Sequence, residues 1–382
     1  MLLGAFTRVD NADRGLAVSE LSDALRAARE TTGLSLTRMA QLTHYSKPYL
    51  SLIETGKRRP VPEVVTAYEQ VLGVPIGSDP LRRAHEWLVS DSPTAVQRRS
   101  GRRVGDSLAD ALDARVVELR HLDDVVGSAD LLPAVRQELA EVESLVRNGS
   151  YTEPVGRRLL TATGELAQLA GWVASDAGKY ADAQRLYLGG VDAAEEAGND
   201  SLAAQLFSSL SYQVANVADP HDALLLARTA AKGARSATPV VRALLLERVA
   251  WASAKTGDRD ATLRALDAVD DTYEQRSPGI EEPEWVYWLN RAEIDVMAGR
   301  CMIELGTPDR AEPLLSAAVA TYPEEHSREV ALYLSWLAES YARTGELDAA
   351  TATLERARRF AARMPSARTD ERFKTLEGLL PL

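Results

Sequence analysis

Five short turn sequences in the C-terminal half of the chain constrain its fold more than any other feature. Each places a turn of Gly, Asp or Pro just before a small residue that can open a helix. The alanines that follow the turns are 40, 38, 50 and 38 residues apart. Helix, turn and helix, repeated in this way, predict a superhelix of stacked helix pairs. These alanines are Ala183, Ala223, Ala261, Ala311 and Ala349.

The repeat resembles the tetratricopeptide family over about residues 165–365. The family period is about 34 residues, so the longer and uneven period here indicates extended helices. Apolar residues spaced by three and four within 108–122, 132–142 and 159–173 predict further helical layers before the array. The resemblance implies a concave groove, lined by the first helix of each pair, in which an effector would bind.

The 50-residue interval is irregular because it contains an acidic segment, residues 273–288, that Pro and Gly interrupt. Trp285 and Trp288 are three residues apart, so they would share a helix face and could form an aromatic wall for a small molecule or a peptide. Amide side chains nearby could bind a peptide backbone. The plainer interpretation is that these aromatic residues pack against a neighbouring helix. The candidate effector-binding residues are Asn216, Trp251, Trp285, Trp288 and Asn290.

A second constraint lies near the N-terminus, between Ser35 and Pro60. Ser35 and Ser46 can each cap a short helix, Pro48 suits the first turn of the second helix, and Gly56 ends it. Two short helices joined by a tight turn and followed by basic residues match the way a recognition helix enters the major groove of DNA. The residues expected to face inward are Met39, Ala40, Leu42, Leu50 and Ile53.

A longer motif surrounds these two helices. It comprises Leu25-Arg26, Arg29, Gly33-Leu34-Ser35, Met39-Ala40, Ser46, Leu50, Ser51, Ile53, Glu54, Gly56, Arg58 and Pro60. In this motif, over about 55 residues, the chain resembles the phage-repressor-type (XRE) helix-turn-helix family. His44 stands where that family usually has a Gly, and His is among the residues that tolerate a positive φ. The resemblance implies that Arg29 pairs with Glu54 and holds the first helix, Glu20–Thr32, on the recognition helix.

The helical phase separates two faces of the recognition helix, because Leu50 and Ile53 point inward. Lys47 could reach guanine, Ser51 can bond either base type, and Leu52 could touch a thymine methyl group. Tyr49 lies between the faces and could pack in the core or bind a phosphate. The start of the preceding helix and the basic loop are expected to hold the DNA backbone. The candidate DNA-binding residues are Thr37, Arg38, Lys47, Pro48, Tyr49, Ser51, Leu52, Thr55, Lys57, Arg58 and Arg59.

Charge is divided unevenly along the chain, whose net charge is −12. Residues 1–103 carry 15 Lys and Arg against 11 Asp and Glu, a net of +4, whereas the remainder carries 29 against 45, a net of −16. A basic head on an acidic body is expected when only one module meets nucleic acid. We therefore expect an all-α protein with four parts: an N-terminal arm (1–19), a helix-turn-helix domain (20–75), an Arg-rich linker (76–105) and a helical tetratricopeptide-like sensor and dimerisation domain (106–382).

The sequence offers no support for catalysis, a cofactor or a metal site. It lacks the Gly-rich nucleotide motifs and HExxH, and its single Cys and five scattered His cannot form a zinc site of the usual kind. Cys301 lies on an apolar helix face and is expected to be buried and inert, whereas Glu281 and Glu282 are expected in solvent. No apolar run reaches the roughly 18 residues of a membrane helix, and the MLLGAF start lacks a basic lead, so we expect a cytoplasmic protein.

The two resemblances together imply a bacterial regulator with a DNA-binding head and a sensing body. We expect a sequence-specific regulator of transcription, a repressor rather than an activator, whose groove binds a small molecule or a peptide. A homodimer is expected because one head presents a small interface, and two heads on a symmetric DNA site about 34 Å apart raise the affinity. Two alternatives stay open: a protein-interaction scaffold that the head targets to DNA, or an antitoxin that neutralises a partner protein.

Overall fold

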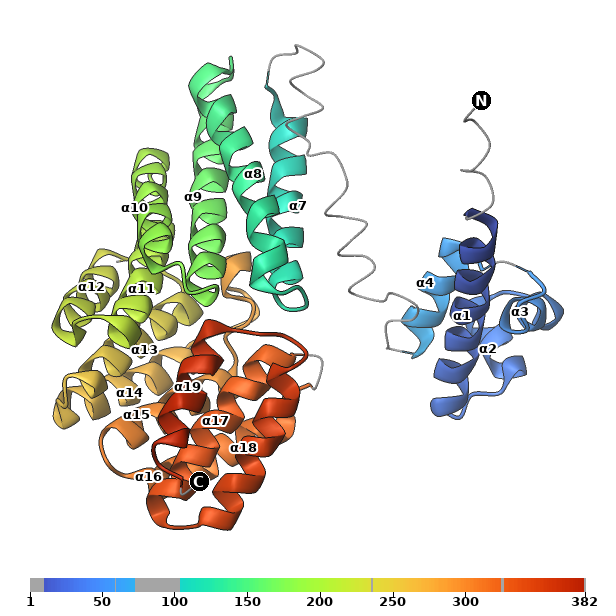
Figure 1. Ribbon diagram of the computed structural model, residues 1–382. Coiled ribbons are helices and arrows are strands. Elements are labelled where there is room, and N and C mark those ends of the chain that lie inside the picture. Colours follow the sequence, from blue (N-terminus) through green and yellow to red (C-terminus); the bar gives the residue numbers. More distant parts are fainter. Residues whose placement is uncertain (1–9, 59, 73–103, 235, 324–325, 381–382) are drawn as a thin grey trace, which may run out of the picture. The chain divides into compact units, whose positions relative to one another are not determined.

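The computed structural model describes residues 10–58, 60–72, 104–234, 236–323 and 326–380, and within them the regular elements are α-helices and one short 3₁₀-helix. The expected all-α fold is confirmed. The chain divides into two compact units, Met1–Glu86, here called the head, and Trp87–Leu382, here called the body (Figure 1). The expected Arg-rich linker, apart from its last two residues, lies outside the described residues. No helix among the described residues is both long enough and apolar enough to cross a membrane.

The head contains the helix-turn-helix that the sequence predicts. Ser35 Oγ accepts the amide of Arg38 at 3.2 Å, and Ser46 Oγ accepts the amide of Tyr49 at 3.4 Å, so both predicted N-caps form. The first helix starts at Asp10, inside the segment 1–19 that was expected to be an irregular arm. The helices of the head are α1 (Asp10–Thr31), α2 (Leu36–Thr43), α3 (Lys47–Glu54) and α4 (Pro62–Leu72).

The turn between α2 and α3 depends on His44, whose φ of 59° lies in the left-handed region. This is the conformation expected for a residue that replaces a turn Gly. Each helix of the head contributes to one core, whose fully buried apolar residues include Leu25, Met39, Leu50 and Tyr68. Leu42 was expected in this core but is 39% exposed, because the buried side of α2 is centred on Met39 and leaves Leu42 at its edge.

The body is a solenoid of helix pairs. It begins with three helices that lie side by side in Figure 1, α7 (Asp106–Asp123), α8 (Ser128–Asn148) and α9 (Glu153–Asp176). Helix α9 pairs with α10, and four more pairs follow before a final helix. These are α10 (Tyr180–Ala197), α11 (Asp200–Val217), α12 (Pro220–Gly233), α13 (Pro239–Lys255), α14 (Arg259–Tyr273), α15 (Arg291–Glu304), α16 (Pro308–Thr321), α17 (Ser327–Thr344), α18 (Leu347–Ala361) and α19 (Ala367–Glu377).

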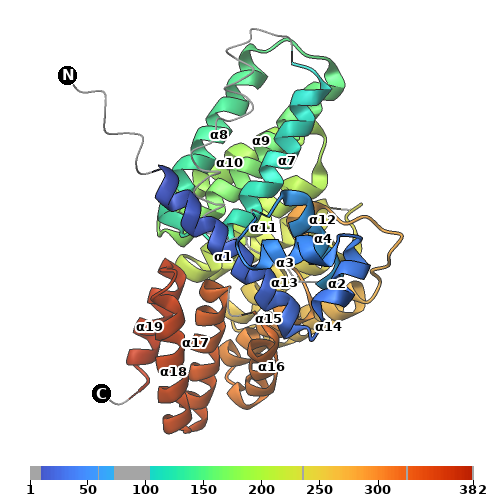
Figure 2. The ribbon, with the colours of Figure 1, turned by 90° about the vertical axis from the view of Figure 1, so that its right-hand side faces the viewer.

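Each of the five predicted turns lies between the two helices of a pair, α9–α10, α11–α12, α13–α14, α15–α16 and α17–α18. Ala183, Ala223 and Ala311 are fully buried near the starts of their helices, where only a small side chain allows the two helices to approach closely. The first helices of the pairs contact one another in succession along the solenoid. Figure 2 shows α17, α18 and α19 side by side at the C-terminal end.

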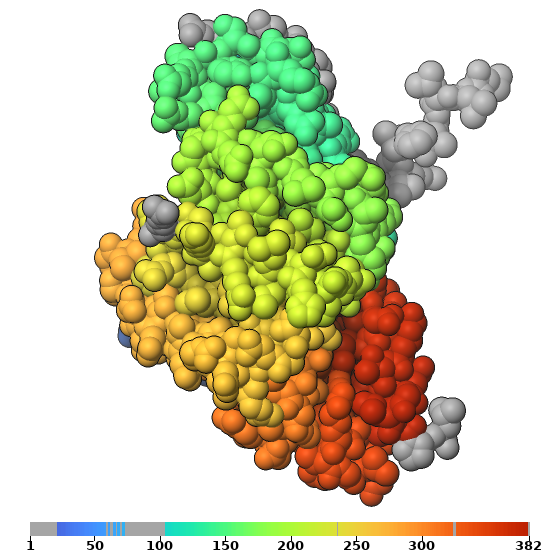
Figure 3. Space-filling view, turned by 90° about the vertical axis from the view of Figure 1, so that its left-hand side faces the viewer, coloured from blue at the N-terminus to red at the C-terminus, as the bar shows by residue number. Residues whose placement is uncertain are grey.

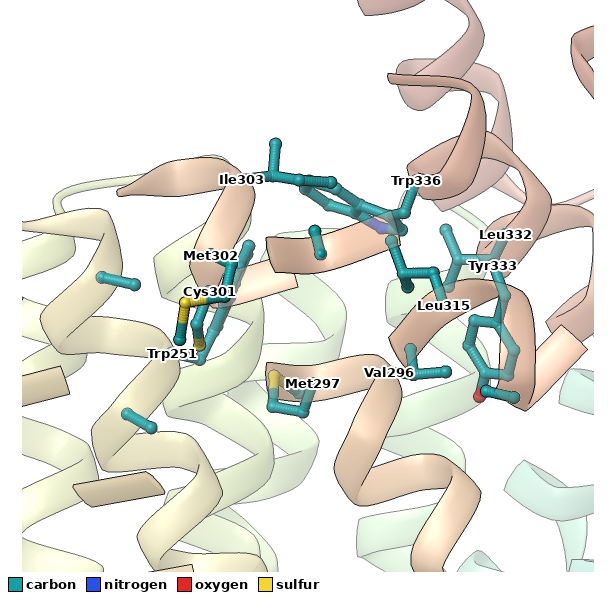
Figure 4. Packing of buried hydrophobic residues seen from close by; sticks show 14 of the residues in the cluster. Trp251, Val296, Met297, Cys301, Met302, Ile303, Leu315, Leu332, Tyr333 and Trp336 are labelled. Carbon is teal, nitrogen blue, oxygen red and sulfur yellow. The ribbon is translucent and has the colours of Figure 1, made fainter. Parts of the chain in front are cut away.

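The interior of the body is apolar, and Figure 4 shows part of it around α15. Cys301 and Met302 project from α15 into the same core as Trp251 of α13. Burial raises the pKa of the Cys301 thiol, which confirms the expected buried and unreactive cysteine. Glu282 was expected in solvent, but it is half-buried because its carboxylate accepts the hydroxyl of Thr238 and, at 3.2 Å, the amide of Val240 at the start of α13.

The far end of the solenoid returns to its beginning. Arg328 on α17 donates to the carboxylate of Asp123, at the end of α7, at 3.0 and 3.1 Å. Asp176, at the end of α9, accepts Arg368 Nε at 2.7 Å and Ser366 Oγ at 2.6 Å. We call Asp123, Asp176, Arg328 and Arg368 the closing cluster. On the face in Figure 3 the colours run from green to orange in chain order, and the red C-terminal helices border the green segment again, so the solenoid is closed.

Candidate DNA-binding surface and effector cavity

Helix α3 is held in place by a buried carboxylate. Arg29 on α1 donates from Nε and Nη2 to the two oxygens of Glu54, at 2.7 and 2.8 Å, and the Tyr68 hydroxyl on α4 donates to Glu54 at 2.8 Å. Glu54 is 4% exposed and Arg29 is 8% exposed. Burial and the neighbouring Glu54 raise the pKa of Tyr68, which therefore keeps its proton. The pair implied by the resemblance thus forms and fixes α3 against both α1 and α4.

The opposite face of α3, together with its C-cap Thr55, carries five of the eleven candidate DNA-binding residues. Lys47, Pro48, Leu52 and Thr55 are exposed, and Ser51 is half-buried. Leu52 is 41% exposed, which leaves a large apolar side chain on the outer surface of a short helix. The Thr55 hydroxyl donates to the Ser51 carbonyl at 2.7 Å, so it is already engaged within the helix. A short helix with a cation at its start and an apolar residue in its middle can follow base edges in a groove.

The flanking candidates lie on both sides of α3. Thr37 and Arg38 are exposed at the start of α2, and Lys57 and Arg58 are exposed in the loop after α3. The Arg58 amide donates to the Leu52 carbonyl at 2.9 Å, which folds this loop back on α3.

Tyr49 was assigned to neither face by the sequence. It is half-buried, its ring lies 5.6 Å from that of Tyr45, and the guanidinium of Arg58 lies 4.7 Å above it. Tyr49 therefore supports the basic loop by a cation–π contact. The remaining candidate of this surface, Arg59, lies outside the described residues.

The concave side of the body encloses a cavity of about 540 Å³. Its wall comes mainly from α9, α11, α13, α15 and α17, the first helices of the five pairs, as expected for a solenoid groove. Binding sites for small organic molecules have volumes of roughly 300–1,000 Å³. The cavity is thus large enough for a small molecule and too small for a long peptide in extended form.

Three of the five candidate effector residues, Trp285, Trp288 and Asn290, line this cavity. The two tryptophans do not share an α-helix face as expected, because the segment forms only a 3₁₀-helix, Glu284–Val286, and a turn. Trp288 Nε1 donates to the Trp285 carbonyl at 3.2 Å, which fixes the turn. The Asn290 side chain is engaged as the N-cap of α15, where it accepts the amide of Glu293 at 3.2 Å.

The other two candidates lie outside the wall of the cavity. Trp251 is 1% exposed and belongs to the core of the body. Asn216 is exposed at the end of α11, and its amide donates to the Tyr212 carbonyl at 2.6 Å. Periodicity places both residues correctly on first helices, but it does not distinguish the side facing the cavity from the side facing the next helix pair.

The charged residues of the cavity wall were not predicted from the sequence. Arg248 of α13 and Arg300 of α15 are 6% and 4% exposed, and their guanidinium groups lie 4.7 and 5.3 Å from the ring of Tyr212. Arg300 Nη1 also donates to the Tyr212 hydroxyl at 3.1 Å. Glu247, next to Arg248, is 1% exposed. The signal in the sequence was a charged residue inside an apolar run, as in LLLERVAW and VMAGRCMI.

The environment of the cavity changes the acidity of two wall residues. Burial raises the pKa of Glu247 to about 8, which favours the neutral form of its carboxyl group. Burial alone would also raise the pKa of Tyr212, but the charges of Arg300, Arg368 and Arg248 outweigh it and lower the value to about 8. The positive charges of these three arginines therefore act together at Tyr212. Among the described residues, no group of three His, Cys, Asp or Glu side chains is arranged to hold a metal ion.

Comparisons with known proteins agree with the architecture of the head. The family described as a helix-turn-helix domain matches residues 20–84. No curated protein gives a significant match. One similar solved structure is BtubC (BKLC) from P. vanneervenii, which is 16% identical, with a TM-score of 0.42 over 60% of this chain and 89% of that chain.

Two other solved structures are similar at lower identity. A Rap protein complexed with competence and sporulation factor is 12% identical, with a TM-score of 0.40 over 70% of this chain and 80% of that chain. PlcR of Bacillus thuringiensis, in complex with the peptide PapR7 and DNA, is 10% identical, with a TM-score of 0.33 over 81% of this chain and 98% of that chain. At TM-scores below 0.5, none of these likenesses carries an argument about function.

Proposed function

We propose that the protein is a cytoplasmic, sequence-specific DNA-binding regulator of transcription, and a repressor rather than an activator. The observation that carries this proposal is the division of α3 into two faces. Its inner face, with Leu50, Ile53 and Glu54, is buried against the other helices of the head, whereas Lys47 and Leu52 are exposed on its outer face. A rigid short helix with an exposed, mixed basic and apolar face is suited to the major groove.

Within this proposal the exposed residues have two roles. Lys47, Ser51 and Leu52 read base edges, with Lys47 placed to bond guanine and Leu52 to touch a thymine methyl group. Residues beside α3 hold phosphates and set the register of the helix, but do not read sequence. They are Thr37, Arg38, Lys57 and Arg58, with Arg59 as a further candidate outside the described residues.

The body is proposed to dimerise and to bind an effector in its cavity. Two heads are needed because one small module buries little DNA surface, and a symmetric pair binds half-sites about 34 Å apart. The effector acts by binding better to one arrangement of the solenoid, which changes the separation of the two heads. The proposal treats the cavity as a binding site that performs no chemistry.

DNA binding can be tested by fluorescence anisotropy on a duplex selected from random sequence. Lys47→Ala is expected to weaken binding to the selected duplex by about 1–3 kcal/mol and binding to random DNA much less. Arg58→Ala is expected to weaken both and to reduce the slope of log affinity against log salt by about one per head. Arg228→Ala is the matched control, because it removes the same charge from an exposed position on α12 of the body.

The two head variants combined with Arg59→Ala provide the decisive result. If this triple variant binds the selected duplex as tightly as the unaltered protein, α3 and its loop are not the DNA-binding surface. If Arg228→Ala weakens binding as much as Arg58→Ala, the loss reflects overall charge and the assignment of a phosphate contact to Arg58 is wrong.

A further inference from the structure

Two buried arginines of the cavity carry more hydrogen-bond donors than the described residues satisfy. A guanidinium group has five N–H donors. Arg248 makes no hydrogen bond to any described residue, its buried Nε has no acceptor, and the nearest carboxylate oxygen, of Glu247, is 3.9 Å away. Arg300 donates only to the hydroxyl of Tyr212, and its buried Nε also has no acceptor among the described residues.

This deficit is not general among the arginines of the cavity. Arg328 binds the carboxylate of Asp123 through two nitrogens, at 3.0 and 3.1 Å. Arg120 lies 3.3 Å from Glu165, and Arg368 Nε lies 2.7 Å from Asp176. These three arginines are therefore each paired with a carboxylate, although Nη2 of Arg368 also lacks a partner among the described residues. Arg248 and Arg300 are hydrogen-bonded to no carboxylate of the described residues.

Within the described part of the chain, the carboxylates of the cavity wall make no hydrogen bond to these two arginines. Glu293 accepts the hydroxyl of Tyr333 at 2.6 and 2.7 Å and that of Tyr322 as well. Asp124 accepts the hydroxyl of Tyr287 at 2.6 Å. Burial raises the pKa of Glu247 to about 8, which favours its neutral form. The two guanidinium groups next to Tyr212 are thus left without a hydrogen-bonded carboxylate among the described residues, which is costly in a buried site.

Aromatic rings hold the two guanidinium groups in position. Arg300 lies 4.3 Å from the ring of Trp251 and 5.0 Å from that of Trp336, and Arg248 lies 5.9 Å from the ring of Trp288. The ring of Trp172 lies 5.8 Å from that of Tyr212 and also faces the cavity. Preorganised cations beside aromatic walls are the arrangement by which proteins bind an anionic group that carries an apolar part.

We propose that the cavity binds a small organic anion, whose carboxylate or phosphate group lies between Arg248 and Arg300 and whose apolar part packs against Trp172 and Trp288. The volume of about 540 Å³ lies within the range of small-molecule sites. The lowered pKa of Tyr212 supports the same conclusion, since it reports the positive field in which the anion would lie. The inference rests on the proposed effector role of the cavity, but the binding itself is measured without DNA.

The test uses the full chain and pairs of aromatic probes, of which one is an anion and the other is neutral. Benzoate, indole-3-acetate and phenyl phosphate are compared with benzamide, indole-3-acetamide and phenol at constant ionic strength, by thermal unfolding and calorimetry. At least one anion is expected to raise the melting temperature, whereas its neutral counterpart does not. The phosphate and carboxylate probes distinguish the two possible head groups. If no anion exceeds its neutral counterpart, the proposal is overturned.

Variants separate a binding role from a structural one. Arg248→Met and Arg300→Met are expected to weaken anion binding about tenfold or more, the effect of losing a charge-assisted hydrogen bond. Without ligand, Arg248→Met is expected to melt at the same or a higher temperature, because it removes an uncompensated buried charge. Arg242→Met, exposed on the same helix, should change neither quantity, and Arg328→Met should lower the melting temperature by breaking paired contacts.

Two outcomes distinguish this inference from the proposed function. If Arg248→Met lowers the melting temperature as much as Arg328→Met and leaves anion binding unchanged, the arginine is structural and the inference is overturned. If an anion binds through Arg248 and Arg300 but leaves DNA affinity unchanged, the inference stands and the proposed regulation of DNA binding fails.

Discussion

Replacement of Arg29 should destabilise the head far more than replacement of an ordinary charged residue on a surface helix. Arg29→Met keeps the apolar stem but leaves the carboxylate of Glu54 buried, with only the hydroxyl of Tyr68 as a side-chain partner. Breaking a buried ion pair in this way costs about 3–5 kcal/mol. A domain the size of the head, 86 residues at about 0.05–0.15 kcal/mol per residue, is stable by only about 4–13 kcal/mol. One substitution should therefore remove a large part of the stability of the head.

The pair and the single residue should behave differently. Arg29→Met combined with Glu54→Leu removes both charges, and replacing a buried ion pair by apolar residues is often close to neutral. In this double variant the hydroxyl of Tyr68 loses its acceptor Glu54. The carbonyl of Leu34 loses Arg29, which donates to it at 2.9 Å. Each loss costs about 1 kcal/mol. We expect the double variant to lose about 2 kcal/mol, which is less than Arg29→Met alone.

Hydrogen exchange in the full chain measures this difference, because the larger body dominates thermal unfolding. Slowly exchanging amides of α2 and α3 should exchange about 100-fold faster or more in Arg29→Met, since about 1.4 kcal/mol corresponds to a factor of ten. The control is Arg26→Met, whose partner Glu30 is half exposed, so that loss of this pair should leave amide exchange almost unchanged. Equal effects of Arg26→Met and Arg29→Met, or a double variant as damaged as the single one, would refute the reasoning.

Three further predictions concern other parts of the chain. The pKa of Asp176 is lowered from 3.8 to about 2: burial alone would raise it, but Arg368 and Arg328 outweigh burial. Asp176 therefore contributes stability above about pH 4, and this contribution is lost as the pH falls toward 2. Asp176→Asn should lower the melting temperature at pH 7. It should also reduce the fall of the melting temperature between pH 4 and pH 2, as measured by circular dichroism. Ultraviolet titration should detect one tyrosine that ionises near pH 8, and this signal should be absent in Tyr212→Phe. The pKa of Tyr212 in the folded protein lies below its unfolded value of 10.0, so the contribution of Tyr212 to stability should grow between pH 8 and 10. In His44→Gly the amides of α2 and α3 should exchange more slowly, because Gly adopts the left-handed backbone at this position without strain. The relief of strain, roughly 1–2 kcal/mol, is larger than the cost in chain entropy that Gly adds on folding.

The head could be predicted closely because its signals are local. Ser35 and Ser46 mark helix starts through bonds to amides three residues away, and the turn at His44 follows from its position between them. The pair of Arg29 and Glu54 is 25 residues apart and could be expected only through the family resemblance. Leu42 was misplaced because eight residues of α2 contain too few apolar positions to define the centre of the buried face.

The architecture of the body could be predicted from the sequence, but the charged residues of its cavity could not. Five turns and their spacing were sufficient to predict the stacked helix pairs, because each turn joins two helices that are adjacent in the sequence. Arg248 and Arg300 lie 36 and 88 residues after Tyr212 in the sequence. The apolar runs around them indicate burial, but they do not show that both side chains face the same cavity. The broken segment before α15 was read as a helix because the three-residue spacing of Trp285 and Trp288 fits both an α-helix and the short 3₁₀ turn that forms.

The closing cluster gives the body a property that open repeat arrays do not have. In an open solenoid a repeat can be added or lost at little cost, because each repeat contacts only its neighbours. Here Arg328 must meet Asp123 across 205 residues, so every pair between them has to contribute the correct rotation and rise. Gain or loss of one helix pair would separate these partners and open the cavity. The number of repeats in this protein is therefore constrained by geometry, and variation in length should be confined to the turns on the outer surface.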